Sequence, residues 1–379
     1  MRFLSLKALR SIDGRFIFVV LSLMLISLLV ISSNDTFYTA QEASWLSPRV
    51  AGQLRWFGIG SIVFCFFVAL DYTVLRSWSW LLYAFTLLLL VGLFFTEGRK
   101  SVQRWYRIPG LGLPLQPSEL AKLIVVVTLS AFLEYRRQIA THWGTALWAC
   151  LIVLIPFVLI YKQPDLGTAL LLYPISMAIF YFGNVKIFIV KTMAFLILAG
   201  LFVVFLFFSG IISHEKARPY VTQVIKEYQY ERLNPNTHHQ KFSQIAIGVG
   251  GVTGSGWKQS LFTRRGWLPE PQTDSVFSAF GEEFGLVGML TLLGLYYGLI
   301  TLSFQITAVA RDRFGRLLAS GITVYLAMHI IVNISMMCGL IPITGVPLVL
   351  VSYGGSSVMV TMAALGILQS IYSRRYNFL

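Results

Sequence analysis

Acidic, basic and aromatic residues are concentrated in one stretch, residues 248–288, where a glycine-rich segment leads into an apolar helix. Asp274 directly precedes that helix, and Arg264, Arg265 and Trp267 lie a short way upstream. As an N-cap, the Asp274 carboxylate would accept a hydrogen bond from a backbone N–H group. As a general base, it would remove a proton at a partly dehydrated helix mouth. Both roles are compatible if one oxygen stays free, and we expect the reaction site here.

Two further groups of charged residues precede another apolar helix. Glu119 and Lys122 are spaced i and i+3, which places them on one helix face and predicts a local ion pair. Paired charges at membrane depth are costly, however, and usually line a cavity. Arg104 and Arg107 flank two aromatic residues, so they either anchor the chain at the headgroup level or bind phosphate. Both alternatives stay open.

Other polar residues favour structural roles. Asp165 follows a proline in a tight turn and is expected to cap the next helix. His329 and Asn333 are spaced i and i+4 inside an apolar segment, which indicates an interhelical hydrogen-bonding pair. For Glu282 and Glu283, the pattern predicts that one faces protein or a cavity without deciding which.

The composition indicates the scaffold that holds these residues. Of 379 residues, 56% are hydrophobic and only 12% charged, with apolar runs long enough to cross a bilayer. Cys65, Cys150 and Cys338 read as small buried hydrophobes, with neither a disulfide framework nor a metal site. We therefore predict one all-α polytopic membrane domain, residues 1–379, with about ten transmembrane helices. The predicted spans are 16–33, 53–70, 78–95, 119–134, 145–161, 166–183, 187–209, 275–305, 316–337 and 354–373.

The distribution of lysine and arginine predicts the orientation. Short loops on the side of the basic arm, residues 1–15, carry more of them than the other short loops, which places both termini in the cytoplasm. The long loop between the seventh and eighth helices, residues 210–274, then faces the periplasm. It is nonetheless rich in positive charge, which suggests an anionic ligand. Its basic residues are Lys216, Arg218, Lys226, Arg232, Lys241, Lys258, Arg264 and Arg265.

Several ordered motifs resemble the SEDS family (shape, elongation, division and sporulation), which are membrane peptidoglycan glycosyltransferases. The segment 343–347 resembles the RodA-like elongation branch rather than the FtsW division branch. The chain departs from the family pattern at Gly52, Phe242 and Gln272, but not at Asp274. The motifs that carry the resemblance are residues 103–105, 116–119 with Lys122, 163–170, 245–248, 268–270, 273–274, 281–285 and 351–357.

The resemblance implies polymerisation of lipid II, with inversion and release of undecaprenyl pyrophosphate, during elongation and shape maintenance. Asp274 would be the base, and the leaving group needs positive charge rather than a strong acid. Glu119 would hold Lys122 in place. The candidates for pyrophosphate are Arg104, Lys122, Arg232, Arg264 and Arg265. The other implied substrate-binding residues are Lys258, Glu270, Thr273, Ser352 and Tyr353.

The resemblance also implies partners and a location. The partners are lipid II, a class B penicillin-binding protein transpeptidase and membrane lipids, with no nucleic acid. The location is the bacterial inner membrane, with the active site facing the periplasm. No cofactor is implied, and a divalent cation is left open. A lipid II flippase and a structural scaffold are the competing functions; polymer formed by the purified protein would separate them.

Overall fold

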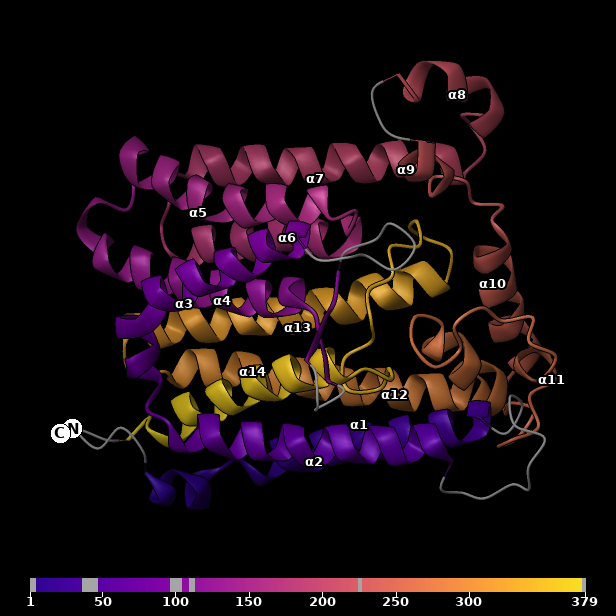
Figure 1. Cartoon of the computed structure of the whole chain (residues 1–379), viewed down its shortest axis with the longest axis horizontal. Coiled ribbons are helices and arrows are strands. Elements are labelled where there is room, and N and C mark those ends of the chain that lie inside the picture. The colour runs from indigo at the N-terminus through magenta and orange to yellow at the C-terminus, as the bar shows by residue number, and fades with distance from the viewer. Residues whose placement is uncertain (1–4, 36–46, 96–103, 109–112, 224–226, 377–379) are drawn as a thin grey trace.

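Ten long helices run roughly side by side in the computed structural model, which describes residues 5–35, 47–95, 104–108, 113–223 and 227–376 (Figure 1). Each coincides with one of the ten predicted spans, so the predicted all-α membrane architecture is confirmed. The helices are α1 (Gly14–Asp35), α2 (Pro48–Ala69), α3 (Tyr72–Gly92), α4 (Pro117–Tyr135), α5 (Trp143–Lys162), α6 (Leu166–Phe182), α7 (Ile187–Phe208), α12 (Val276–Val309), α13 (Arg313–Met337) and α14 (Gly355–Ser373).

Eight of these helices are long and apolar enough to cross a membrane. The remaining two are α6, which is apolar but shorter, and α4, which contains three charged residues. Local sequence determines where several helices begin. Pro48 and Pro117 occupy the first turns of α2 and α4, where the N–H group that proline lacks would have no partner within the helix. Asp71 accepts a hydrogen bond from the Thr73 N–H group and thereby caps α3.

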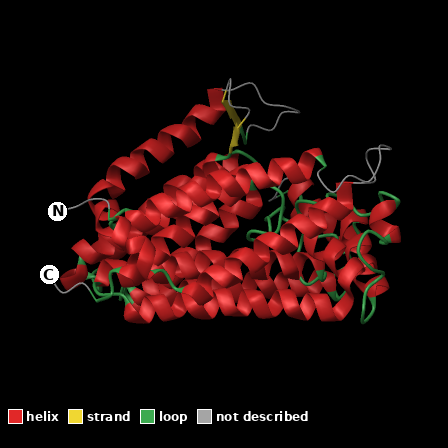
Figure 2. Cartoon of the chain, turned by 90° about the horizontal axis from the view of Figure 1, so that it is seen from below, coloured by secondary structure: helices red, strands yellow, loops and turns green. Residues whose placement is uncertain are grey.

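Both termini lie at one end of the bundle, and residues 210–274 lie at the other (Figure 1). This long segment contains α8 (His214–Val221), α9 (Glu227–Glu231), α10 (His238–Gly250) and α11 (Leu261–Arg264). Short 3-10 turns are η1 (Leu6–Ser11), η2 (Leu93–Phe95) and η3 (Arg137–Ile139). The sequence did not predict the antiparallel pair of strands, β1 (Tyr106–Ile108) and β2 (Leu113–Leu115), visible in Figure 2.

Helix α12 is broken at Gly285, whose φ of 61° and ψ of −160° are not helical. The predicted span 275–305 is therefore two pieces: a buried segment up to Phe284 and a membrane segment beyond the break. Residues 251–256 fill the gap. Leu286 N–H donates to the Gly251 carbonyl at 2.9 Å, and Ser255 N–H donates to the Glu282 carbonyl at 2.9 Å. A Cβ on Gly285 would lie 2.4 Å from the Gly254 nitrogen, so only glycine fits.

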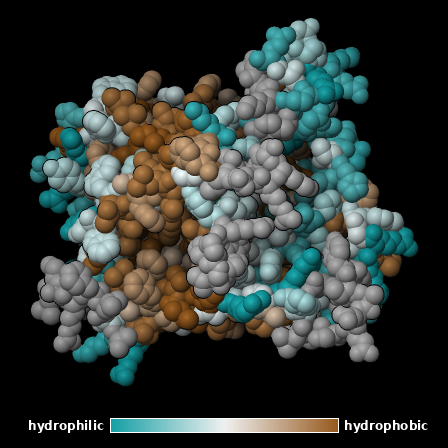
Figure 3. All heavy atoms as spheres, viewed as in Figure 1, coloured by the Kyte–Doolittle hydropathy of each residue, from teal (hydrophilic) through white to brown (hydrophobic). Residues whose placement is uncertain are grey.

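Burial distinguishes central from peripheral helices. In the most apolar 18 residues of α14, 83% of residues are buried, and in those of α13, 67%, whereas in α7 only Val190 and Phe207 are buried. Helix α7 thus packs on the bundle through one side, which includes Ile189 and Met193, and exposes most of its other apolar side chains, as a lipid-facing helix does. Figure 3 shows hydrophobic residues over the middle of the bundle and hydrophilic ones around the long segment.

The three cysteines differ from expectation. Cys65 and Cys338 are exposed and Cys150 is only half-buried, and all three are free. The prediction of buried thiols is therefore wrong: hydropathy alone does not tell a lipid-facing position from a core position.

Candidate active site

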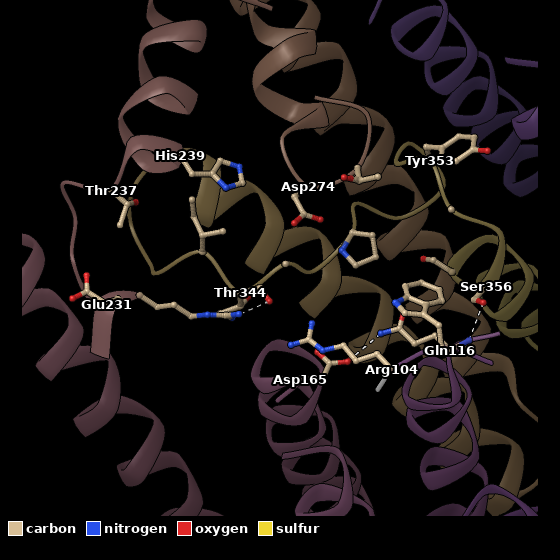
Figure 4. A pocket seen from close by; sticks show the side chains of 18 residues that line it. Arg104, Gln116, Asp165, Glu231, Thr237, His239, Asp274, Thr344, Tyr353 and Ser356 are labelled. Carbon is tan, nitrogen blue, oxygen red and sulfur yellow. Dashed lines mark hydrogen bonds between the residues drawn. The ribbon is translucent and has the colours of Figure 1, made fainter. Parts of the chain in front are cut away.

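A cavity of about 590 Å³ opens at the end of the bundle that carries the long segment. Loops on several elements form its walls. Figure 4 shows Asp274 near its middle, with Asp165 and Arg104 across from it. The lining residues are Arg104, Trp105, Gln116, Asp165, Glu231, Arg232, Thr237, His239, Thr273, Asp274, Ile343, Thr344, Gly345, Pro347, Tyr353, Gly354, Ser356 and Ser357.

Asp274 lines this cavity without capping α12. The N-cap is Ser275, and its side chain makes no capping hydrogen bond. The backbone of Asp274 is fixed instead, because the Asn333 side-chain amide donates to its carbonyl at 3.0 Å. No described residue donates a hydrogen bond to the Asp274 carboxylate. The N-cap interpretation is therefore wrong, and both carboxylate oxygens are available to a ligand.

The surroundings of Asp274 raise the pKa of its carboxyl group to about 6. Burial is the largest cause, because it penalises the charged form, and the nearby Glu270 carboxylate adds to it. Arg232 and Arg104 act in the opposite direction. The carboxyl group is thus a stronger base than an ordinary aspartate, yet mostly ionised at neutral pH.

Two arginines carry positive charge into the cavity. Arg104 donates through its Nε to the Gln163 carbonyl at 3.3 Å and through Nη2 to the Pro164 carbonyl. Arg232 donates to the Thr344 carbonyl at 3.4 Å. These backbone contacts orient the two guanidinium groups at the cavity wall.

Asp165 has the predicted structural role. One carboxylate oxygen accepts from the Thr168 N–H group and caps α6. The other accepts from the Gln116 amide and the Ser118 hydroxyl, both at 3.0 Å. Asp165 therefore ties the start of α4 to the start of α6 at the cavity wall.

Ser352 and Tyr353 hold the Asp274 segment from the other side. The Ser352 hydroxyl donates to the Thr273 carbonyl at 2.6 Å, and Tyr353 N–H donates to the Gln272 carbonyl at 2.8 Å. Tyr353 and Thr273 line the cavity, whereas Ser352 is buried behind it. Of these residues, Ser352 is thus positioned to support the site rather than to touch a ligand.

Lys122 and Glu119 lie behind the cavity and do not line it. Lys122 is completely buried, and its Nζ lies 2.7 Å from Glu119 Oε1 and 2.7 Å from His329 Nε2. The predicted ion pair is confirmed. The structure does not bring Lys122 into the cavity, because buried protein surrounds the ammonium. His329 and Asn333 do form the predicted contacts between elements.

Four other predicted binding residues lie outside the lining. Lys258 packs over the Trp257 ring at 4.8 Å, and Arg265 packs over the Trp267 ring at 4.9 Å. Arg264 is exposed on the short helix α11, and Glu270 is exposed beside Asp274. Of these four, Glu270 acts on the site through its charge; the structure does not bring Lys258, Arg264 and Arg265 into the cavity.

Glu282 and Glu283 are both buried, and both bind the long segment. Glu282 accepts from the Phe262 N–H group at 2.6 Å and from the Thr263 hydroxyl at 2.8 Å. Glu283 accepts hydrogen bonds from the hydroxyls of Ser33 and Ser260. The pair therefore fastens residues 260–263 to the buried part of α12.

Sequence reasoning missed Glu231, Thr237 and His239, which line the cavity from the end of α9 to the first turn of α10. His239 Nε2 lies 2.6 Å from the Ser275 hydroxyl, next to Asp274, and burial lowers the pKa of its imidazole. The only signal was a pair of adjacent histidines, 238 and 239, in a polar loop. Because one side chain of such a pair points inward and the other away, their sequence alone selects neither.

Comparisons with known proteins agree with this architecture. A family model described as a cell cycle protein, FTSW_RODA_SPOVE, matches residues 14–377. Peptidoglycan glycosyltransferase MrdB of Escherichia coli is 32% identical over 355 residues, 93% of this chain and 92% of that protein. Stage V sporulation protein E of Bacillus subtilis is 31% identical, over 96% of this chain and 98% of that protein.

Solved structures are also similar. One comes from a study of how a peptidoglycan synthase complex coordinates polymerization and crosslinking. It has a TM-score of 0.74 and 28% identity, over 97% of this chain and 99% of that one. The Rod shape determining protein RodA of Thermus thermophilus has a TM-score of 0.67 and 27% identity, over 97% of this chain and 98% of that one.

Proposed function

The chain belongs to the family of FtsW, RodA and SpoVE, and from this premise we propose that it polymerises lipid II in the cavity lined by Asp274. It is a multi-pass membrane protein and a peptidoglycan glycosyltransferase that acts in cell elongation. The assignment of the reaction to this cavity depends on one observation. The Asp274 carboxylate, which accepts no hydrogen bond from a described residue, lies in a cavity lined by two arginines.

In the proposed reaction, Asp274 is the general base. The acceptor sugar hydroxyl attacks the anomeric carbon of the donor and passes its proton to an Asp274 oxygen. A pKa of about 6 suits this role, because the group is ionised at neutral pH and still basic enough to take the proton. The Asn333 contact to the Asp274 backbone would keep the carboxylate directed into the cavity.

Arg104 and Arg232 are proposed to stabilise the leaving group. As the new glycosidic bond forms, the bond from the anomeric carbon to the pyrophosphate oxygen breaks, and negative charge collects on pyrophosphate. Pyrophosphate is already a good anion, so it needs positive charge rather than a proton. Guanidinium groups match phosphate oxygens in a bidentate way. Attack opposite the leaving group inverts the anomeric centre, so no second carboxylate is required as a nucleophile.

The same proposal places the protein in the cell. We place the termini in the cytoplasm and residues 210–274, with the cavity, on the outer face of the bacterial inner membrane, as the short-loop charges indicate. A related chain comes from a complex that combines polymerization with crosslinking. We propose that this chain likewise works beside a crosslinking transpeptidase, a class B penicillin-binding protein.

The test is polymerisation of purified lipid II by wild type and Asp274→Asn. Asparagine keeps the size, and no capping bond is lost because the N-cap is Ser275. We expect normal expression, retained lipid II binding and a turnover lower by roughly a hundredfold or more. Gel-resolved polymer at saturating lipid II measures it. Polymer within a few-fold of wild type would exclude Asp274 as the base.

A further inference from the structure

A second cavity, of about 630 Å³, lies between the start of α3 and the end of α4. The start of α3 and the end of α4 lie at the end of the bundle that carries the termini, whereas α12 begins, just after Asp274, at the other end (Figure 1). Three arginines line this second cavity: Arg76 from α3, and Arg136 and Arg137 just after α4. It is therefore separate from the proposed reaction site.

The charged side chains of this cavity lack hydrogen-bond and ion-pair partners within the described chain. No described residue forms an ion pair or a side-chain hydrogen bond with the guanidinium groups of Arg76, Arg136 or Arg137. The Nε atom of Arg136 and the Oε2 atom of Glu134 are buried and without a hydrogen-bond partner. Leaving buried polar atoms unpaired is costly, so this arrangement calls for a polar ligand from outside the chain.

The depth of the cavity indicates that the ligand belongs to a membrane. Arg76 is the fifth residue of α3, so it lies only about 6 Å along the helix from its start. Trp80 and Tyr135 also line the cavity and are 53% and 85% exposed. Exposed tryptophan and tyrosine mark the level of lipid headgroups. The cavity therefore opens at that level, beside the acyl chains.

The charges select an anion. Three arginines against Glu134 leave a net positive cavity, and guanidinium groups bind phosphate in a bidentate way. The Trp80 ring meets Phe132 edge-on, with centroids 6.5 Å apart, and forms an apolar wall next to the arginines. Basic pockets between membrane helices bind anionic headgroups in this way.

We propose that this cavity binds the phosphodiester headgroup of an anionic glycerophospholipid, with an acyl chain lying along α3 beside Trp80. The arginines contact the phosphate. The unpartnered Glu134 oxygen accepts a hydrogen bond from a headgroup hydroxyl, which favours a glycerol headgroup. This site does not depend on the reaction proposed for Asp274, and it would act in the opposite leaflet.

Native mass spectrometry of the purified full chain, titrated with dioleoylphosphatidylglycerol, tests the proposal through the affinity of the first bound lipid. The variant is Arg76→Gln with Arg136→Gln. The control, Lys186→Gln with Lys191→Gln, removes the same charge at the same end of the bundle. We expect the cavity variant to bind about thirtyfold more weakly, near fivefold for each arginine, and the control about as wild type.

Equal losses in both variants would overturn the proposal, because they would reflect general attraction to the surface. Equal affinity for dioleoylphosphatidylcholine would overturn it too. So would saturation of the site by water-soluble glycerol phosphate without lipid binding. A second measurement does not depend on the arginine variants: brominated phosphatidylglycerol should quench tryptophan fluorescence less in Trp80→Phe than in wild type. Unchanged quenching would also contradict a lipid beside Trp80.

Discussion

At the scale of single residues, the charges around Asp274 should control the pH dependence of polymerisation. The carboxylate is the active form of the proposed base, so the rate should rise with pH through about 6 and then level off. Glu270 raises the pKa of Asp274, so Glu270→Gln should lower that pKa and move the rising limb to lower pH. Arg232 lowers it, so Arg232→Gln should move the limb to higher pH.

Initial rates of polymer formation between about pH 5 and 8 measure these shifts. The position of the limb is the readout, because the Arg232 variant should also lose rate through the leaving group. Glu215→Gln removes an exposed carboxylate on α8 and should leave the limb in place. A limb that moves to higher pH in Glu270→Gln would contradict the assignment of Asp274 as the titrating group.

Residues also show what the sequence could predict. Asp274 and Arg104 stand in polar segments that precede apolar helices, which singles both out, whereas Arg232 was named only through the resemblance to the family. The burial of Lys122 could not, because it depends on His329, which comes from a helix far away in the chain. His239 was missed because the polar residues at the start of α10 offer no periodic pattern that separates inward from outward side chains.

At the scale of elements, the contact between α4 and α13 should depend on a balanced buried charge. Glu119→Gln leaves the Lys122 ammonium buried beside His329 and the Tyr325 ring, without its carboxylate partner. Breaking such a pair costs about 3–5 kcal/mol, whereas replacing both partners is often nearly neutral. We expect the unfolding temperature of purified protein to fall clearly in Glu119→Gln and to recover in Glu119→Gln with Lys122→Met.

The control is Lys191→Met, which removes an exposed ammonium on α7 and should change stability by only about 0.5 kcal/mol. Activity per folded molecule is the second readout. If the double variant is as stable as wild type but inactive, Lys122 has a role in the reaction beyond holding the helices together.

The helical elements themselves were largely predictable, because a bilayer demands long apolar segments with satisfied backbone groups. All ten predicted spans are helices. The break in α12 was not predictable, since Gly285 departs from helical geometry only because residues 251–256 fill the gap beside it. The strand pair was not predicted either, because strands of three residues are too short to show a periodic sequence pattern.

At the scale of the whole molecule, we expect the orientation in the membrane to follow the charges of the short loops. After Cys65, Cys150 and Cys338 are replaced by serine, Gln259→Cys should react with an impermeant maleimide on intact spheroplasts. Gln259 is exposed, and its neighbour Lys258 has a φ of 61°, which makes Lys258 a poorer place for cysteine. Arg311→Cys, at the end with the termini, should react only after the membrane is opened.

Labelling is measured by gel shift, with the other position in each sample as the control. The reverse labelling pattern would mean that the protein has the opposite orientation in the membrane. It would then place the Asp274 cavity in the cytoplasm and the arginine cavity between α3 and α4 at the outer leaflet.

The junction at Gly285 has a mechanical consequence. Residues 251–256 are hydrogen-bonded into the break in α12, and the Trp257 indole donates to the Leu29 carbonyl of α1. Hydrogen bonds therefore join the long segment to both helices. A lengthening sugar polymer needs room to slide after each addition. These hydrogen bonds oppose movement on the α1 and α12 side. We therefore expect the polymer to move past the opposite side of the bundle, where α7 leads into α8 and α9 and few residues are buried.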